Sequence, residues 1–221
     1  MNPVDSAYAW RRLVASVMLS TLGGIGMWAL AVAIPSVQQD LGVSRADISF
    51  SYSMNMLGFF LGGVLIGRLV DRHGIVVASI VSAFGLAAGF ALAASTTSLV
   101  MFAAAQVVVG FSAAATFGPL IADISLWFEK RRGVAVAIAA SGNYIAGAVW
   151  PPIVEAMIHH FGWRTTYLSA AALCVVVMIP LAFALRRRAP DHTTGAAVAV
   201  TQRSLASLGL SPNGLQALLV L

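Results

Sequence analysis

Residues 49–95 read SFSYSMNMLGFFLGGVLIGRLV, then DRHG, then IVVASIVSAFGLAAGFALAAS, and this stretch decides the fold. Two long apolar runs, 49–70 and 75–95, flank a charged turn of four residues. A helix needs roughly 20 apolar residues to cross the hydrocarbon core of a bilayer. Backbone groups find no water there, so each run must be helical. The stretch therefore predicts a helical hairpin that crosses a membrane twice.

The rest of the chain repeats this pattern. Of the 221 residues, 59% are hydrophobic and 10% are charged, whereas a soluble domain carries about 25% charged residues. The first apolar run, Leu13–Ile34, is too long for a signal-peptide core, so we interpret it as a span. The sequence predicts an all-α membrane protein with six transmembrane helices, at about 13–35, 49–70, 75–95, 99–121, 134–157 and 166–185.

The basic residues predict the orientation. Eleven of the thirteen Lys and Arg residues fall on one side of the predicted spans, and only Arg45 and Arg164 fall on the other. Lys and Arg favour the cytoplasmic side, so we expect both termini in the cytoplasm. The membrane that we expect is the plasma (inner) membrane. The charges sit between apolar runs and not along one folded face, which argues against a nucleic-acid partner.

The domain organisation follows from these spans. Residues 1–12 form a cytoplasmic N-terminus, 13–185 a six-helix bundle in the lipid bilayer, and 186–210 a polar cytoplasmic linker. Ser211 and Pro212 are typical of a helix start. The apolar run that follows is too short to span, so residues 211–221 predict the start of a truncated seventh helix. We therefore expect a missing C-terminal half.

One motif lies in the turn between the second and third spans, with Gly67, Leu69, Asp71, Arg72 and Gly74 at its fixed positions. It resembles the signature G-x-L-x-D-R-x-G of the major facilitator superfamily. Further stretches are similar to the monocarboxylate-transporter-like branch of that superfamily: WFEKRRG at 127–133, SGN at 141–143 and GWR at 162–164. The resemblance implies the N-terminal bundle of a major-facilitator-type fold, built as 3+3 helix repeats.

Physical chemistry gives this motif a gating role. Gly67 would let its helix approach a neighbour closely. Asp71 is an anion at the membrane edge, suited to an arginine or a helix N-terminus of the other half. Such a contact can latch one side closed and release as the halves rock. The simpler alternative is a charged turn, in which Arg72 pairs locally or holds the topology.

The resemblance implies a substrate cavity lined chiefly by the first and fourth helices. Polar and aromatic side chains on small-residue stripes are the candidates for its lining: Trp28, Asn55, Gln106, Asn143 and Tyr144. Gln106 stands where many proton-coupled relatives carry arginine. Its amide would contact substrate or bond a neighbouring helix, and both alternatives stay open. For the glycines of these stripes, close helix packing is the expected role.

The resemblance also implies the activity, which is secondary active transport of a small organic anion, a monocarboxylate, with proton coupling as an open option. No Lys or Arg lies deep in a predicted span, although a desolvated carboxylate needs a cation. The missing half would supply it. A self-associating half-transporter or channel is the alternative, against which the helix start at Ser211 argues.

A membrane enzyme is disfavoured. The four histidines lie in loops or at span ends, so no general base is available in the membrane. Cys174 is the one cysteine, which excludes an internal disulfide and a cysteine-based metal site. We expect no catalytic residues, no metal and no cofactor.

Overall fold

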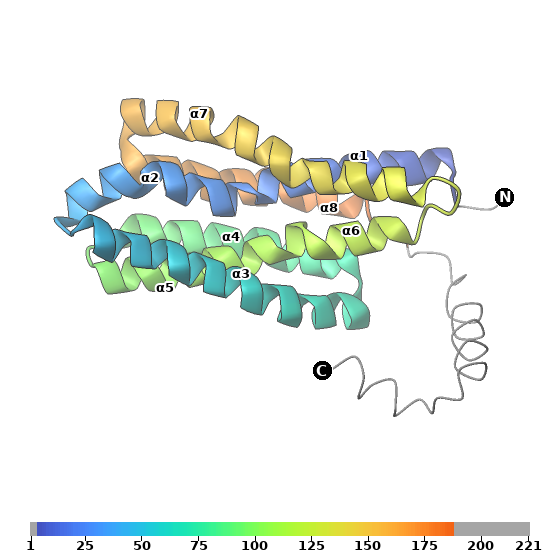
Figure 1. Cartoon of the computed structure of the whole chain (residues 1–221), viewed down its shortest axis with the longest axis horizontal. Helices are drawn as coiled ribbons and strands as arrows, with labels where there is room; N and C mark the ends of the chain where they lie inside the picture. Colours follow the sequence, from blue (N-terminus) through green and yellow to red (C-terminus); the bar gives the residue numbers. More distant parts are fainter. Residues whose placement is uncertain (1–3, 188–221) are drawn as a thin grey trace. The chain divides into compact units, whose positions relative to one another are not determined.

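The computed structural model describes residues 4–187, and every regular element in that range is helical. Figure 1 shows the helices running along one common direction. The elements are α1 (Ala7–Gly23), α2 (Ile25–Leu41), α3 (Arg45–His73), α4 (Ile75–Ser95), α5 (Leu99–Ala113), the 3-10 turn η1 (Ala114–Thr116), α6 (Gly118–Ser125), α7 (Arg132–Leu173), the π-helical turn η2 (Cys174–Met178) and α8 (Ile179–Phe183). Most of the predicted linker and the predicted seventh helix lie outside the described residues.

Five helical segments in the described range are long and apolar enough to cross a membrane: Ala7–Leu41, Arg45–His73, Ile75–Ser95, Leu99–Ser125 and Arg132–Phe183. The sequence predicts six. The difference lies in the last segment, whose 52 residues would measure about 78 Å as one straight helix, far more than a bilayer needs. Six separate spans therefore stay a prediction.

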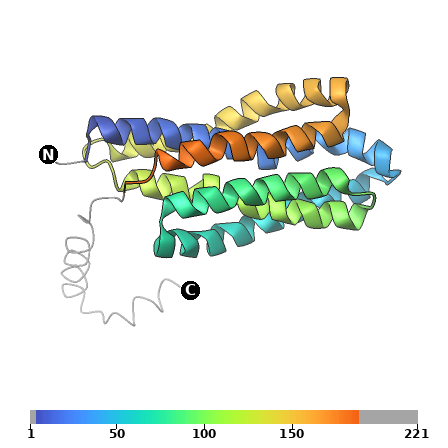
Figure 2. The ribbon, with the colours of Figure 1, turned by 180° about the vertical axis from the view of Figure 1, so that it is seen from behind.

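The last segment contains one non-helical residue, Gly162, with φ 78° and ψ 160°. Figures 1 and 2 show the ribbon reversing within α7, so that its second part returns along the bundle. The sequence predicts a loop over 159–165 at this point. A single glycine suffices because, without a Cβ, it adopts positive φ at little cost and can redirect the chain.

The turn between α2 and α3 is also shorter than the sequence predicts. Only residues 42–44 separate α2 from α3, where a loop over 37–47 was expected. Ser44 caps α3: its Oγ accepts a hydrogen bond from the Asp47 amide, and Asp47 Oδ2 accepts one from the Ser44 amide, each at 3.2 Å. This reciprocal pair satisfies amide groups at the helix start, so α3 can begin directly after the turn.

The first and fourth predicted spans are each divided into two helices. The chain passes from α1 to α2 at Gly24, which keeps right-handed helical angles. It passes from α5 to α6 through η1 and Phe117, whose φ of −120° and ψ of −89° are not helical. Pro119, in the first turn of α6, fits this restart because its missing amide hydrogen would lack a helical partner there.

Glycines bring α3 and α5 together. A Cβ built on Gly110 would lie 1.9 Å from the backbone oxygen of Asn55, and one on Gly58 would lie 2.2 Å from that of Val107. A Cβ on Gly62 would lie 2.2 Å from the backbone oxygen of Phe111. No side chain fits at these three positions, so the predicted packing role of the stripe glycines is confirmed at Gly62 and Gly110, and Gly58 adds a third contact of the same kind.

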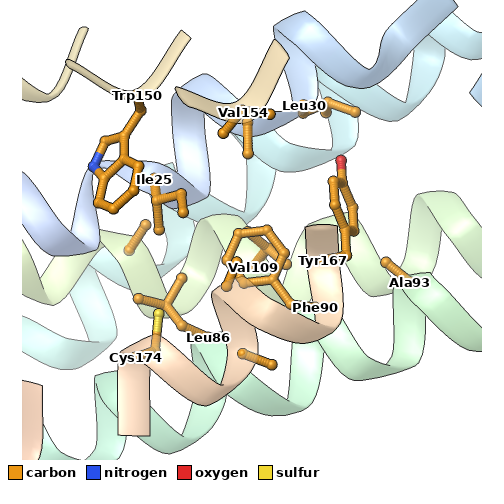
Figure 3. Close-up of a cluster of buried hydrophobic side chains, with 14 of the residues drawn as sticks. Ile25, Leu30, Leu86, Phe90, Ala93, Val109, Trp150, Val154, Tyr167 and Cys174 are labelled. Atoms are coloured by element: carbon orange, nitrogen blue, oxygen red, sulfur yellow. The ribbon is translucent and has the colours of Figure 1, made fainter. Parts of the chain in front are cut away.

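The buried core lies where α2, α4, α5 and both parts of α7 meet, and Figure 3 shows its side chains. The rings of Phe90 and Tyr167 meet edge to face with centroids 5.2 Å apart, and Cys174 of the same cluster is 1% exposed. Large apolar side chains also cover the outside of the bundle: Phe60 is 68% exposed and Val100 is 79% exposed. Such a surface suits lipid as its solvent.

Candidate functional site

The centre of the bundle contains a buried amide pair. Asn55, on α3, is fully buried, and its Nδ2 donates to the Gly26 carbonyl and to Gln106 Oε1, both at 3.1 Å. Gln106, on α5, is 1% exposed. In this conformation Gln106 therefore bonds a neighbouring helix, which is one of the two alternatives that the sequence left open.

This pair is not fully satisfied. Asn55 Oδ1 and Gln106 Nε2 are buried without a hydrogen-bond partner among the described residues. The hydroxyl of Tyr167, from the returning part of α7, faces Gln106 without a hydrogen bond of normal geometry. Buried polar atoms without partners are uncommon and call for an explanation. We call Asn55, Gln106 and Tyr167 the central polar cluster.

Two other cavity candidates lie on a different interface. Trp28 is half-buried, and a Cβ built on Gly147 of α7 would lie 2.7 Å from its indole ring. Asn143 Oδ1 would lie 3.4 Å from a Cβ built on Gly24. Trp28 and Asn143 therefore belong to the contact of α1 and α2 with α7. The indole Nε1 of Trp28 is also buried without a partner in the described range.

Tyr144 does not join either group. Its side chain is 72% exposed on the outside of the described bundle. The structure thus brings together Asn55 with Gln106, places Trp28 and Asn143 on a second interface, and leaves Tyr144 apart. Tyr167 was not a predicted site residue: its place near a span end predicts an aromatic anchor at the membrane interface, whereas the structure buries it fully.

The motif residues lie at the end of α3 and beside a cavity of about 320 Å³. Gly67 and Asp71 contribute to its lining, with Phe117, Gly118 and Pro119 of the divided fourth segment opposite. A Cβ on Gly67 would meet nothing within 4 Å in residues 4–187. The close approach expected at Gly67 is therefore not made by any described helix.

Asp71 and Arg72 are exposed, and neither forms an ion pair within the described range. Leu69 is half-buried next to them. Gly74 has φ 86° and ψ 167°, and its amide donates to the Val70 carbonyl at 2.8 Å. Gly74, the last glycine of the motif, is thus the single residue between α3 and α4. Its positive φ favours glycine at this position, because glycine has no Cβ.

A buried ion pair at one end of the bundle escaped the sequence analysis. Arg12 Nε and Nη2 donate to the two oxygens of Asp123 on α6, each at 2.7 Å, and the side chains are 1% and 10% exposed. Arg12 Nη1 donates to the carbonyls of Leu185 and Arg187, and its guanidinium lies 4.6 Å from the Trp127 ring centroid. We call this group the Arg12 clamp.

The sequence analysis counted Arg12 only as a topogenic charge. The missed signal was Asp123, a carboxylate directly after the apolar run of the fourth span, since such a group needs a cation when buried. At the other end Arg164 pairs with Asp40 and donates to the Thr96 carbonyl at 2.8 Å. These side chains are 38% and 40% exposed, so water screens this pair far more than the Arg12 clamp.

No group of three or more His, Cys, Asp and Glu side chains in the described residues could hold a metal ion. A helical bundle with apolar flanks and a polar centre defines the class: an integral membrane protein. The chain belongs to the Major Facilitator Superfamily, whose family pattern matches residues 17–220.

Several known transporters resemble this chain. It is 28% identical over 156 residues to the MFS-type transporter pynF of Aspergillus niger, which covers 69% of the chain and 36% of that protein. It is 23% identical over 195 residues to monocarboxylate transporter 3 of Gallus gallus, covering 85% of the chain and 36% of that protein. It is 27% identical over 173 residues to monocarboxylate transporter 3 of Mus musculus, covering 78% of the chain and 35% of that protein. The chain thus spans about a third of the length of these relatives, which are transporters and not enzymes.

Proposed function

We propose that the chain forms the N-terminal bundle of a secondary active transporter that moves a small organic anion by alternating access. The observation that carries the proposal is the central polar cluster. Asn55, Gln106 and Tyr167 place polar atoms without partners in the middle of an apolar bundle. Intramembrane polar groups are costly and tend to mark a substrate pathway. A substrate that supplies the missing partners accounts for them.

We further propose six spans arranged as two repeats of three. Gly74 and Gly162 support this arrangement, because they have nearly the same backbone angles, φ 86° and ψ 167° against φ 78° and ψ 160°. In the proposed repeats each glycine joins the second helix to the third. The first helix of each proposed repeat is also divided, at Gly24 and at residues 114–117. Divided helices at matching positions are a feature of transporters built from repeats.

Carboxylate recognition is the proposed chemistry of the polar centre. Gln106 Nε2 and the Tyr167 hydroxyl are donors there without partners in the described range, and Trp28 Nε1 is a third such donor on the neighbouring interface. Donors are what a carboxylate needs. Two of the relatives are named monocarboxylate transporters, which supports the same class. None of these three groups supplies a positive charge, so we propose that the counter-ion comes from the second half.

We propose that Asp71 belongs to a gate. Its exposed carboxylate and the open face of Gly67 border one cavity, which leaves room for a segment from the second half. A cation or a helix N-terminus in that segment would pair with Asp71 in one state and separate in the other. We propose that this gate and both termini lie on the cytoplasmic side, because the Lys and Arg residues concentrate at that end. The plasma membrane is the proposed location.

The test is uptake by the complete protein in liposomes. We expect a labelled short-chain monocarboxylate to enter faster than its neutral amide, and an inward proton gradient to accelerate entry if protons are coupled. Equal uptake of acid and amide would refute the anion assignment, and indifference to the gradient would refute proton symport.

The gate is tested by Asp71→Asn. A hydrogen bond to a charged group contributes about 1.5–3 kcal/mol, so its loss in one state should slow turnover roughly tenfold or more. The substrate KM should stay within about twofold, because Asp71 lies outside the polar cluster. Glu129→Gln is the matched control, since Glu129 is also exposed and unpaired in the described range. Equal rates for the two variants would remove Asp71 from the gate.

A further inference from the structure

An apolar groove runs between α1 and the last described helices. Figure 2 shows α1 and the segment that ends in α8 lying side by side. The cavity between them measures about 800 Å³, and its lining comes from α1, α7, η2 and α8: Val17, Met18, Thr21, Leu22, Ile145, Val176, Val177, Pro180, Leu181 and Ala184. We call it the α1–α8 groove.

One side of the groove is formed by an irregular stretch of helix. The helix widens into the π-turn Cys174–Met178, which is followed by Pro180 in the first turn of α8. Such π-turns are rare and occur often at functional sites. Thr21 has the one polar side chain in the lining. Its hydroxyl already has acceptors within the bundle, the carbonyl oxygens of Val17 at 2.9 Å and Gly142 at 3.1 Å. The groove therefore offers an occupant apolar contact alone.

A basic pocket of about 390 Å³ adjoins one end of this groove. It is lined by Tyr8, Arg11, Arg12, Phe183, Ala184, Arg186 and Arg187, and Ala184 borders both cavities. Arg12 is committed to Asp123. Arg11, Arg186 and Arg187 have no carboxylate partner among the described residues, and the Arg187 guanidinium lies 4.7 Å from the Tyr8 ring centroid.

The two cavities together form an amphipathic site with three available cations at one end and an apolar groove behind them. An anionic phospholipid has the same polarity profile, with a phosphate headgroup and acyl chains. Basic pockets between helices at the membrane edge recognise such headgroups. We propose that this site binds one anionic phospholipid, with its phosphate at Arg11, Arg186 and Arg187 and an acyl chain in the α1–α8 groove.

Charge complementarity favours lipid over a protein segment in this groove. The apolar lining alone would accept either occupant, but the available cations gather where the groove ends, which is where the headgroup of a bilayer lipid lies. A helix of the second half would have to bring its own anion to that point. The inference does not depend on the transported substrate.

The experiment measures lipid retention by the complete protein after delipidation, using native mass spectrometry. The probes are a long-chain phosphatidylglycerol, a phosphatidylcholine with the same chains, and glycerol 3-phosphate. We expect phosphatidylglycerol to bind at least tenfold more tightly than phosphatidylcholine, and glycerol 3-phosphate not to displace it. Equal binding of the two lipids would overturn the proposal, as would displacement by the soluble phosphate, which would indicate a free-anion site.

Variants locate the site. A triple variant with Arg11→Gln, Arg186→Gln and Arg187→Gln should bind phosphatidylglycerol more weakly, by about fivefold for each arginine removed. The triple variant with lysine at the same positions should retain most of the binding. The matched control removes three other charges that are exposed and unpaired in the described range, at Arg68, Lys130 and Arg131. Equal losses of phosphatidylglycerol binding in the two triple variants would show that bulk surface charge causes the binding, which would overturn the proposal.

Ala184→Trp tests the groove without changing any charge. The larger side chain fills the junction of the two cavities, so we expect loss of long-chain phosphatidylglycerol and an unchanged thermal midpoint. Unchanged lipid retention in this variant would show that no acyl chain uses the groove. Covering of the groove by the second half would give the same result and would equally overturn the proposal.

Discussion

The substitution Asp123→Asn should destabilise the bundle strongly, because it removes the anion from the Arg12 clamp. The guanidinium of Arg12 is 1% exposed and donates two 2.7 Å hydrogen bonds to Asp123. Once the carboxylate is neutral, a buried cation keeps only carbonyl acceptors and the Trp127 ring. An unpaired buried charge is among the costliest defects in a protein interior.

The magnitude follows from this geometry. Removing one partner of a buried pair costs about 3–5 kcal/mol. Arg12 retains the Leu185 and Arg187 carbonyls, and the asparagine amide oxygen can accept one hydrogen bond, so we expect about 3 kcal/mol. For a domain of 150–250 residues this corresponds to a fall in Tm of about 6–12 °C.

Cys174 provides the assay. It is the one cysteine of the 221 residues and is 1% exposed, so a fluorogenic maleimide reacts with it only as the bundle opens. Thermal unfolding in detergent is followed by this signal. Asp40→Asn is the control, because its pair with Arg164 is about 40% exposed and should contribute at most about 1 kcal/mol. Equal Tm shifts for Asp123→Asn and Asp40→Asn would refute the reasoning.

A double-mutant cycle separates the pair from its surroundings. Arg12→Met alone leaves the Asp123 carboxylate buried without a cation, whereas Arg12→Met with Asp123→Leu leaves no charge at all. The double variant should therefore be more stable than Arg12→Met by about 1–3 kcal/mol, and additive effects of the two substitutions would contradict this expectation.

Two further predictions concern glycines, and the same thiol assay measures both. Gly110→Ala should lower the unfolding free energy by about 1–3 kcal/mol, because its Cβ would lie 1.9 Å from a backbone oxygen of α3 and the two helices must separate. Gly63→Ala, whose Cβ would meet nothing within 4 Å, is its control, and equal effects would refute the packing argument. Gly162→Ala should cost about 1 kcal/mol or more, because alanine is strained at φ 78°. Gly133→Ala, in open space at a helical position, should change stability little, and a neutral Gly162→Ala would show that the reversal does not need glycine.

Helix positions were predictable from the sequence because the bilayer constrains the backbone so tightly. Runs of about 20 apolar residues admit one conformation in lipid, and five segments of the required length and apolarity occur where the sequence predicts them. The ends of the helices were less predictable. Ser44 and Gly74 shorten the turns, and caps of this kind act through local hydrogen bonds and backbone angles that hydropathy does not report.

The motif residues could be selected from the sequence, but their surroundings could not. Gly67 was expected to approach a neighbouring helix closely, and no described helix does so. The pairing of Asp71 with the second half stays a prediction, and both residues border an open cavity in the described bundle. Of the five cavity candidates, Asn55 and Gln106 share a hydrogen bond, whereas Tyr144 is exposed. A helical period indicates which residues share a face, but not which neighbouring helix covers that face.

The sequence by itself determined that this protein is an α-helical membrane protein of the Major Facilitator Superfamily, because apolar length and a short signature motif are local properties of the chain. Only the tertiary structure decided which polar groups meet. Arg12 and Asp123 are 111 residues apart and Asn55 and Gln106 are 51 apart. Each pair forms because helix packing brings distant segments together, and burial then favours a hydrogen bond or ion pair between the groups that meet.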